Sequence, residues 1–325
     1  MTGGVCWVLS NGRAGTVNQC LGLAEAVGFS ITVKEVRPRA LWRWLPPRLW
    51  PWALRSLGPE SDPIEEPWPD LVIACGRSTE AIAVAIRRAA AKEDQTTFTV
   101  YLQRPSHNTE QFDLLAPPLH DQVTGSNVIA TLGALHRVTP ELLAADAEKF
   151  AALVAPLPRP LIAVLVGGTG NAYRMTETAA RNLGQQLAAL SRDQDMGLAI
   201  TVSRRTGVKN TAALRAELAD IPSVIWDDEG DNPYFGFLGL ADAIIVTADS
   251  ISMVSEACAT GKPVYVAEIP GGSAKFERFH EGLRSKGLTR RFAGDIELWS
   301  ASPLDDTARV AAAVRERLAS IAAPR

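Results

Sequence analysis

The chain has 325 residues, of which 46% are hydrophobic, as expected for a globular protein with two α/β domains of about 150 residues each. Its 33 Lys and Arg residues against 36 Asp and Glu give a net charge of -3, so overall attraction to nucleic acid is not expected. No window reaches about 18 apolar residues, and the first residues lack the pattern of an export signal. We therefore expect a cytoplasmic protein.

Short apolar runs alternate with helical patterns in the first half of the chain. The runs predict strands at 5–9, 31–36, 71–74, 98–102 and 128–132, and the longer patterns predict helices at 16–27, 79–91 and 140–154. The segment 156–160 then has three prolines in five residues. Neither a helix interior nor a central strand tolerates so many prolines, so a domain boundary is expected at this segment.

A second series of elements begins directly after the prolines. Strands are predicted at 161–166, 198–202, 224–226, 243–247 and 264–267, helices at 177–190, 212–218 and 252–259, and a final helix at 305–321. Because these apolar runs do not alternate with polar residues, they predict parallel sheets covered on both faces. The fold class is therefore α/β, with two Rossmann-like domains, an N-terminal one at 1–155 and a nucleotide-binding one at 161–303, and a cleft between them.

The turn between the strand 243–247 and the following helix is the most informative part of the chain. Asp249 or Ser250 can cap the helix, whose start favours an anion such as phosphate. Ser252 and Met253 lie in its first turn, and Glu256 falls on the same face as Asp249 and Ser252, where its carboxylate could hold sugar hydroxyls. The alternative is an ordinary capped helix with one solvated glutamate.

In each half of the chain, one loop of small residues follows the first strand. The loop after 161–166 contains Gly167, Gly168 and Thr169, whose backbone amides could approach a phosphate. Neither loop completes a dinucleotide-binding or P-loop glycine motif, which argues against a nicotinamide dehydrogenase and a P-loop NTPase. Both loops could instead be plain tight turns. In the first half, the residues expected to contact an acceptor are Ser10, Asn11, Gly12, Arg13, Gly15 and Asn18.

Arg204 and Arg205 follow the strand 198–202 and could hold a diphosphate in bidentate fashion without a metal. The alternative is that they pair with nearby acidic side chains. The acidic loop 226–234 could hold a metal ion, but clustered acids in a loop are more often solvated, so we expect no metal and no cofactor.

His120 and Asp121 are the expected catalytic pair. A histidine ordinarily titrates near neutrality, and an adjacent carboxylate could orient it as a general base on an acceptor hydroxyl. His107 is a weaker candidate for the same role. The alternative for His120 is a hydrogen-bonded structural histidine.

The segment 41–52 contains four of the eight tryptophans, and five arginines but no acidic residue lie between Val36 and Pro59. Tryptophan together with arginine favours the interface of an anionic membrane or the surface of another protein. The alternative is a flap folded onto the core of the first domain. The four tryptophans are Trp42, Trp44, Trp50 and Trp52.

These features resemble the mitochondrial fission protein family of the elongated-mitochondria type, which has bacterial members. The resemblance is carried by the blocks 10–19, 118–137, 203–206, 232–234 and 241–266, and most specifically by the run TADSISMVSEA from Thr247 to Ala257. At the level of the superfamily the chain is similar to GT-B glycosyltransferases and to the related sugar-nucleotide epimerases.

The resemblance implies a GT-B arrangement with the nucleotide on the C-terminal domain and a last helix, within 304–325, that returns to the N-terminal domain. It also implies pyrophosphate contacts for Gly168, Thr169, Ser250 and Ser252 and a ribose contact for Glu256. Gly207 departs from the family pattern, in which proline is expected.

Three functions are consistent with the sequence. The first is a metal-independent glycosyltransferase that uses a nucleotide-diphosphate sugar and a membrane-proximal or lipid-linked acceptor. The second is a non-catalytic GT-B scaffold that binds the inner face of a membrane or a partner protein peripherally. The third is a sugar-nucleotide epimerase, for which only one acid/base candidate is present.

Overall fold

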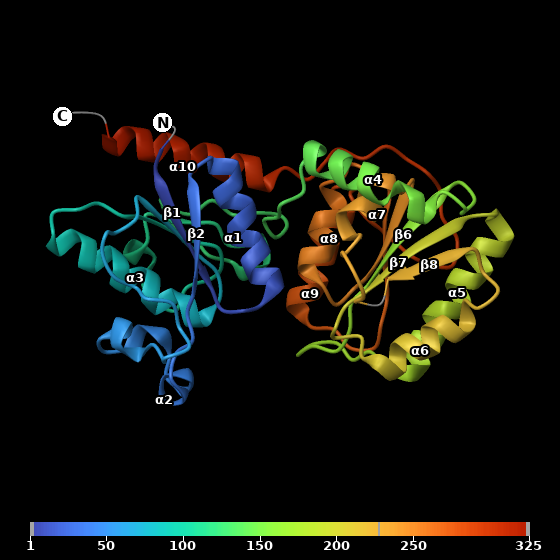
Figure 1. Ribbon diagram of the computed structural model, residues 1–325, viewed down its shortest axis with the longest axis horizontal. Coiled ribbons are helices and arrows are strands. Elements are labelled where there is room, and N and C mark those ends of the chain that lie inside the picture. Colours follow the sequence, from blue (N-terminus) through green and yellow to red (C-terminus); the bar gives the residue numbers. More distant parts are fainter. Residues whose placement is uncertain (1–2, 227, 323–325) are drawn as a thin grey trace. The chain divides into compact units, whose positions relative to one another are not determined.

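The computed structural model describes residues 3–226 and 228–322, which form two compact units (Figure 1). The first unit contains the residues up to Arg137 together with those from Asp305 onward, and the second contains Val138–Leu304. Each unit is built on one parallel sheet. Among the described residues, no helix is both long and apolar enough to cross a membrane.

The first sheet has the strand order β2-β1-β3-β4-β5. Side chains alternate between its two faces, so that Cys6 and Val8 of β1 belong to one buried cluster and Trp7 and Leu9 to another. Both faces are therefore covered, as the apolar runs predict. The strands are β1 (Val5–Ser10), β2 (Ser30–Glu35), β3 (Leu71–Ala74), β4 (Phe98–Tyr101) and β5 (Leu114–Leu115).

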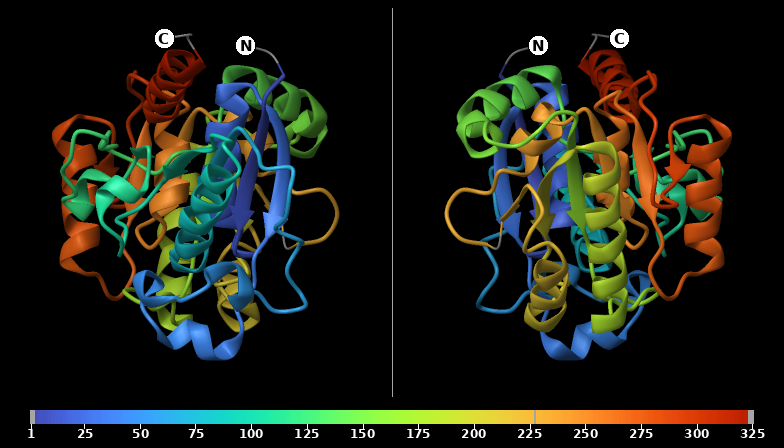
Figure 2. Two further views of the ribbon diagram at one scale, coloured as in Figure 1. Left: turned by 90° about the vertical axis from the view of Figure 1, so that its left-hand side faces the viewer. Right: turned by 90° about the vertical axis from the view of Figure 1, so that its right-hand side faces the viewer.

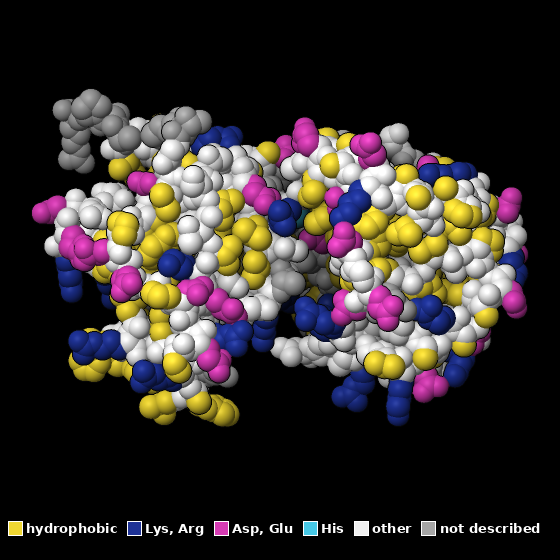
Figure 3. Space-filling model, in the orientation of Figure 1, with side chains coloured by type: hydrophobic (Ala, Val, Ile, Leu, Met, Phe, Trp, Pro, Cys, Tyr) yellow, Lys and Arg dark blue, Asp and Glu magenta, His cyan; other side chains and the backbone are white. Residues whose placement is uncertain are grey.

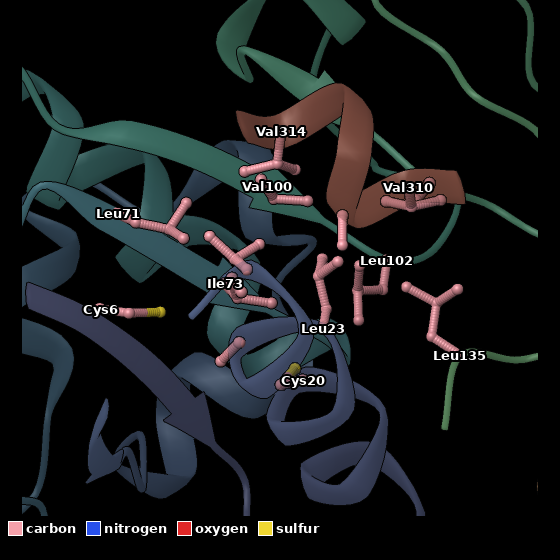
Figure 4. Close-up of a cluster of buried hydrophobic side chains, with 14 of the residues drawn as sticks. Cys6, Cys20, Leu23, Leu71, Ile73, Val100, Leu102, Leu135, Val310 and Val314 are labelled. Atoms are coloured by element: carbon pink, nitrogen blue, oxygen red, sulfur yellow. The ribbon is translucent and has the colours of Figure 1, made fainter. Parts of the chain in front are cut away.

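Helices α1 (Ala14–Val27) and α10 (Asp306–Ala322) pack together over one face of this sheet. Figure 4 shows Val310 and Val314 of α10 beside Val100 of β4 and Leu102, which directly follows that strand. The Asp306 carboxylate also accepts hydrogen bonds from the amides of Leu132, at 2.7 Å, and Gly133, at 3.0 Å. The last helix thus completes the core of the first unit.

Helix α3 (Arg77–Lys92) packs on the other face of the first sheet, and a tryptophan-rich segment packs on α3. This segment consists of α2 (Ala40–Trp44) and the short 3₁₀ helices η1 (Pro47–Leu49) and η2 (Ala53–Ser56). Two further 3₁₀ turns, η3 (Thr109–Gln111) and η4 (Leu119–Asp121), lie before and after β5.

The strand predicted at 128–132 is wrong. The fifth strand is instead Leu114–Leu115, and the later segment makes only the isolated bridges Leu115–Val128 and Pro118–Thr131. An apolar run can bond to a strand at single points without continuing the ladder, and composition alone does not distinguish the two cases.

The second sheet has the order β11-β10-β9-β6-β7-β8, which is the Rossmann order. Its helices lie on both faces (Figures 1 and 2). The strands are β6 (Leu161–Val166), β7 (Gly197–Val202), β8 (Ser223–Trp226), β9 (Ala243–Thr247), β10 (Val264–Ala267) and β11 (Arg290–Arg291). The helices are α4 (Pro140–Val154), α5 (Glu177–Gln194), α6 (Val208–Glu217), α7 (Tyr234–Leu240), α8 (Ile251–Cys258) and α9 (Ala274–Ser285).

Helix α4 belongs to the second unit, so the boundary expected at residue 155 moves to residue 137. It packs on α7, where two glycines permit a close approach. A Cβ atom on Gly239 would lie 2.5 Å from the Leu143 carbonyl oxygen, and one on Gly236 would lie 2.8 Å from that of Asp146. The prolines at 156–160 therefore turn the chain from α4 into β6 within one unit.

Candidate functional site

The strand order of the second sheet reverses between β6 and β9. These two strands lie side by side in the sheet, although β7 and β8 separate them in the chain. In open α/β sheets, ligands bind outside the carboxyl ends of the strands at such a switch point. The residues at these two ends are the glycine loop 167–171 and the turn 248–250. Both were selected from the sequence, and the topology brings them together.

The Asp249 side chain joins these two segments. One carboxylate oxygen accepts a hydrogen bond from the Gly168 amide at 2.8 Å, and the other accepts one from the Thr247 hydroxyl at 2.7 Å. The Thr247 oxygen in turn accepts the Gly167 amide at 2.7 Å. Asp249 is buried, so its carboxylate holds the glycine loop in place and does not face solvent.

Gly167 and Gly168 lie too close to their neighbours to accept a side chain. A Cβ atom on Gly167 would lie 2.2 Å from the Asp249 carboxylate, and one on Gly168 would lie 2.1 Å from the Arg205 carbonyl carbon. The Thr169 amide donates to the Arg205 carbonyl oxygen at 3.0 Å. Because the amides of 167–169 donate within the protein, an anion at this edge would depend on side chains and on the start of α8.

Arg205 supplies such a side chain. Its guanidinium lies 3.0 Å from the Asp249 carboxylate, and the Arg205 side chain is 45% exposed while that of Asp249 is 1% exposed. The buried carboxylate therefore fixes an accessible cation at the switch point. Arg204 is exposed beside it, and Gly207 has a φ of 83°, which a proline could not adopt.

The start of α8 is held from two sides. The Ser250 hydroxyl accepts the Met253 amide at 3.3 Å, as an N-cap does, while Ser252 lies half-buried in the first turn. On the other side, Nε2 of the buried His280 lies 2.9 Å from the Ala248 carbonyl oxygen. Burial lowers the pKa of His280. The ring is therefore neutral near pH 7 and donates to that carbonyl.

Glu256 is buried one turn further along α8, and its carboxylate accepts a hydrogen bond from the Tyr234 hydroxyl. Burial raises the pKa of Glu256 to about 7, and the hydrogen bond from Tyr234 opposes this shift. Tyr234 was not selected from the sequence as a site residue. It begins α7, 22 residues before its partner, so no local pattern linked the two side chains.

The first sheet has its own switch point, between β1 and β3. The Asn11 side-chain oxygen accepts hydrogen bonds from the Thr16 hydroxyl at 2.7 Å and from the Arg13 amide at 3.1 Å. Ser10 likewise accepts the Gly12 amide at 3.1 Å. These bonds order the loop after β1, whereas Gly15 and Asn18 lie in α1.

His120, the expected catalytic base, lies in η4 with Nε2 3.8 Å from an Asp121 carboxylate oxygen. Its side chain is only 3% exposed and that of Asp121 is 11% exposed. A base buried to this extent reaches an acceptor only if the surrounding loop opens.

His107, the weaker candidate from the sequence, has a more suitable geometry. Its Nδ1 lies 2.8 Å from an oxygen of Glu80, a buried side chain at the start of α3. The same oxygen accepts the amides of Ser106, at 2.6 Å, and His107, at 2.8 Å. A carboxylate held this way accepts Nδ1–H and leaves Nε2 as the basic atom. Glu80 was missed because it lies 27 residues from His107 in the chain.

His107 lines a hollow of about 450 Å³ on the first unit. The wall is polar and includes Arg104, Asn108 and Gln122. Its residues come from the segments that follow β4 and η4, at the carboxyl edge of the first sheet. By contrast, Asp227 of the acidic loop 226–234 lies outside the described residues, and Asp231 of that loop pairs with Lys149 at 2.7 Å.

Comparison with known proteins identifies relatives over nearly the whole chain. Residues 14–318 match the family described as Mitochondrial fission ELM1. The chain is 31% identical to Mitochondrial fission protein ELM1 of Arabidopsis thaliana, over 96% of this chain and 91% of that protein. It is 26% identical to the Uncharacterized protein RP120 of Rickettsia prowazekii, over 95% and 97% of the two chains.

Among solved structures, UDP-GlcNAc 2-epimerase from Methanocaldococcus jannaschii matches 97% of this chain and 100% of its own chain, with a TM-score of 0.52 at 12% identity. This likeness concerns the fold, and it confirms the predicted α/β, GT-B-like class. The family match over residues 14–318 and the identity to the plant protein show that the chain belongs to the Mitochondrial fission ELM1 family.

Proposed function

We propose that this protein is a metal-independent, GT-B-like glycosyltransferase that binds a nucleotide-diphosphate sugar at the switch point of its second sheet. The observation that carries the proposal is the ion pair of Arg205 with the buried Asp249. It fixes a half-exposed guanidinium beside the N-terminus of α8, where the helix dipole also favours an anion. A diphosphate is the leaving group of such a transfer, and negative charge develops there in the transition state.

The neighbouring residues have matching roles in this proposal. Arg204 and Arg205 bind the diphosphate, and Ser250 and Ser252 lie where the helix start would meet a phosphate. Glu256 accepts a hydrogen bond from a ribose hydroxyl through the carboxylate that Tyr234 already orients. Asp249, Gly167 and Gly168 act indirectly, because they set the position of the arginine.

The acceptor is bound by the first unit, and His107 is its general base. Glu80 holds Nδ1, so Nε2 can take the proton of an acceptor hydroxyl while the hydroxyl oxygen attacks the sugar. The polar hollow beside His107 gives the acceptor room to bind. His120 remains the base predicted from the sequence, but its burial favours His107.

Titration calorimetry with UDP, GDP and dTDP tests the proposal on the full chain. We expect at least one nucleoside diphosphate to bind with a 1:1 stoichiometry in the absence of metal. If none of them binds at millimolar concentration, the transferase proposal is wrong and the non-catalytic scaffold is favoured. Incubating the nucleotide sugars with no acceptor then separates transfer from epimerisation, because only an epimerase changes the sugar in that sample.

A second candidate function, peripheral membrane binding, is favoured by the surface of the tryptophan-rich segment. Trp44 is 86% exposed and Trp52 is 75% exposed, and Leu41 and Leu49 are also exposed. Figure 3 shows hydrophobic and basic side chains gathered on the surface around α2. Trp42 and Trp50 instead pack against each other, with ring centroids 6.1 Å apart, and hold the segment together. The segment is thus both a flap and an apolar, basic surface suited to an anionic membrane.

A further inference from the structure

A second hollow in the first unit lies between α3 and the segment that runs from η1 to η2. Its volume is about 410 Å³, within the usual range for a small-ligand site. Much of its wall is apolar. Val84, Ala85 and Ala89 line it from α3, and Trp50 and Leu54 line it from the opposite segment. This part of the wall would cover a hydrocarbon chain and exclude water from it.

The remaining wall is strongly basic. Four cationic side chains line the hollow, and Glu93 is the one acidic residue among the lining residues. Glu93 already accepts a hydrogen bond from the Trp68 indole at 3.0 Å. The hollow therefore combines an apolar wall with an excess of positive charge at exposed positions. The four cationic residues are Arg48, Arg55, Arg88 and Lys92.

Two tryptophans connect this hollow to the exposed surface of the same segment. Trp50 is buried, and its indole nitrogen donates to the Leu45 carbonyl oxygen at 3.0 Å. Trp52 lines the hollow although most of its side chain is exposed, and its backbone has a φ of 48°. A bulky residue rarely adopts this left-handed conformation. The turn at Trp52 thus holds a large apolar ring at the edge of a basic, apolar cavity.

We infer that this hollow binds an anionic amphiphile, a molecule with a hydrocarbon chain and a phosphate head group. The chain would lie against the alanines of α3 and Trp50, and the phosphate would pair with the arginines and Lys92. A plain nucleotide would leave the apolar wall without a partner, and an uncharged lipid would leave the basic side chains unmatched. Charge complementarity together with the apolar wall therefore selects the amphiphile.

The inference rests on the proposed function in one respect, because it names the chemical class of the acceptor. His107 lines this hollow as well as the polar one. An amphiphile bound here would therefore share its hollow with the proposed base. Its binding nevertheless depends only on residues of the first unit, so it is measurable without a nucleotide.

Calorimetry with decyl phosphate, below its critical micelle concentration, tests the inference on the full chain. Decanol has the same chain without the charge, and inorganic phosphate has the charge without the chain. We expect saturable 1:1 binding of decyl phosphate that is at least tenfold tighter than that of either comparison compound. Higher salt should weaken it, because the head group is held by charge.

Two pairs of variants locate the binding. Ala89→Phe fills the hollow and should abolish binding of decyl phosphate, whereas Ala91→Phe, on the same helix but outside the lining, should leave it unchanged. Arg55→Gln combined with Lys92→Gln should weaken binding at least tenfold. Lys286→Gln removes an exposed charge from the second unit and should leave the binding of decyl phosphate unchanged. Thermal unfolding of each variant shows whether it is folded.

Equal affinity for decanol and decyl phosphate, or full binding by the folded Ala89→Phe variant, would overturn the inference. A third outcome would overturn the role of the phosphate: decyl phosphate binds weakly, Ala89→Phe abolishes the binding, and Arg55→Gln with Lys92→Gln has no effect on it. The same samples are titrated with the nucleoside diphosphates. Amphiphile binding without any nucleotide binding would contradict the transferase proposal alone, and the reverse result would contradict this inference alone.

Discussion

The carboxylate of Asp249 accepts the backbone amide of Gly168 at 2.8 Å, although the two residues are 81 positions apart in the chain. This bond joins the loop after β6 to the turn after β9, which are the two edges of the switch point in the second sheet. The same carboxylate pairs with Arg205 from the loop after β7. One buried side chain thus sets the relative positions of three loops.

Gly168→Ala should disrupt this arrangement. The added methyl group would lie 2.1 Å from the Arg205 carbonyl carbon, so the backbone must shift. We expect a loss of about 1–3 kcal/mol in the free energy of unfolding and at least a tenfold weaker affinity for the nucleoside diphosphate. Urea unfolding and calorimetry measure the two effects.

Gly170→Ala is the matched control in the same loop. Its methyl group would approach only the end of the Arg205 side chain, at 3.3 Å, and a flexible side chain can move. We expect the free energy of unfolding to change by at most about 0.5 kcal/mol. Equal effects of the two substitutions would show that the backbone contact at Gly168 has no special importance.

Arg205→Gln should weaken nucleotide binding about tenfold or more, since hydrogen bonds from a charged donor to phosphate are lost. The second sheet provides a control at its opposite edge. Arg159, just before β6, pairs with Asp242 at 3.0 Å, the same distance as in the pair of Arg205 with Asp249. Arg159→Gln removes an equal charge from an exposed ion pair at the amino edge and should leave nucleotide affinity unchanged. A similar loss in both variants would indicate a general effect of charge and not a site at Arg205.

Much of the second unit was predictable because its central strands are buried on both faces. The strands at 161–166, 243–247 and 264–267 have the predicted bounds, since a fully buried parallel strand is one continuous apolar run. Helix α7 was missed because its sequence, YFGFLGL, is apolar on every side and contains two glycines. Those glycines lower helix propensity but permit the packing of α4.

The site was predictable in position but not in its contacts. Strand ends and turn residues mark the carboxyl edge of a parallel sheet, so Asp249, Arg205 and the glycine loop were found from local patterns. The bonds from Asp249 to Gly168 and Arg205 were not, because these two residues come from other loops. The same reason explains why Glu80 and Tyr234 were missed, since each acts on a residue more than 20 positions away.

Glu256→Gln should change how stability depends on pH. The pKa of Glu256 is raised from 4.5 to about 7 by burial, so the folded protein holds a proton that the unfolded chain has released between these values. The contribution of Glu256 to the free energy of unfolding is therefore fully present below pH 4.5, and it is lost as the pH rises through about 7. Glutamine has no proton to lose, and its side-chain oxygen can still accept the Tyr234 hydroxyl.

We therefore expect the difference in unfolding free energy between Glu256→Gln and the wild type to grow in favour of the variant by about 2 kcal/mol from pH 5 to pH 8. Urea unfolding at several pH values measures it. Parallel curves for the two proteins would contradict the raised pKa. At neutral pH, nucleotide binding through the Glu256 carboxylate should also release protons, which calorimetry in buffers of different ionisation enthalpy detects.

The contact between His107 and Glu80 predicts which ring nitrogen carries the proton. Because the Glu80 carboxylate lies 2.8 Å from Nδ1, the neutral ring should be protonated at Nδ1 and bare at Nε2. Nitrogen-15 NMR of the imidazole at pH 8 distinguishes the two tautomers, with His107→Gln to assign the signal. A ring protonated at Nε2 would rule out the proposed base, since no basic nitrogen would then face an acceptor.

Trp44→Ala combined with Trp52→Ala should release the protein from anionic membranes. Both indole rings are largely exposed on the tryptophan-rich segment, and their removal leaves the contact between Trp42 and the buried Trp50 intact. We expect the wild type to float with vesicles containing phosphatidylglycerol, less so at high salt, and binding by the double variant to be at least about tenfold weaker. Leu298→Ala, an exposed apolar residue in the second unit, is the control. If the wild type stays in solution with these vesicles, the exposed surface does not bind membranes, and a partner protein becomes the better explanation for it.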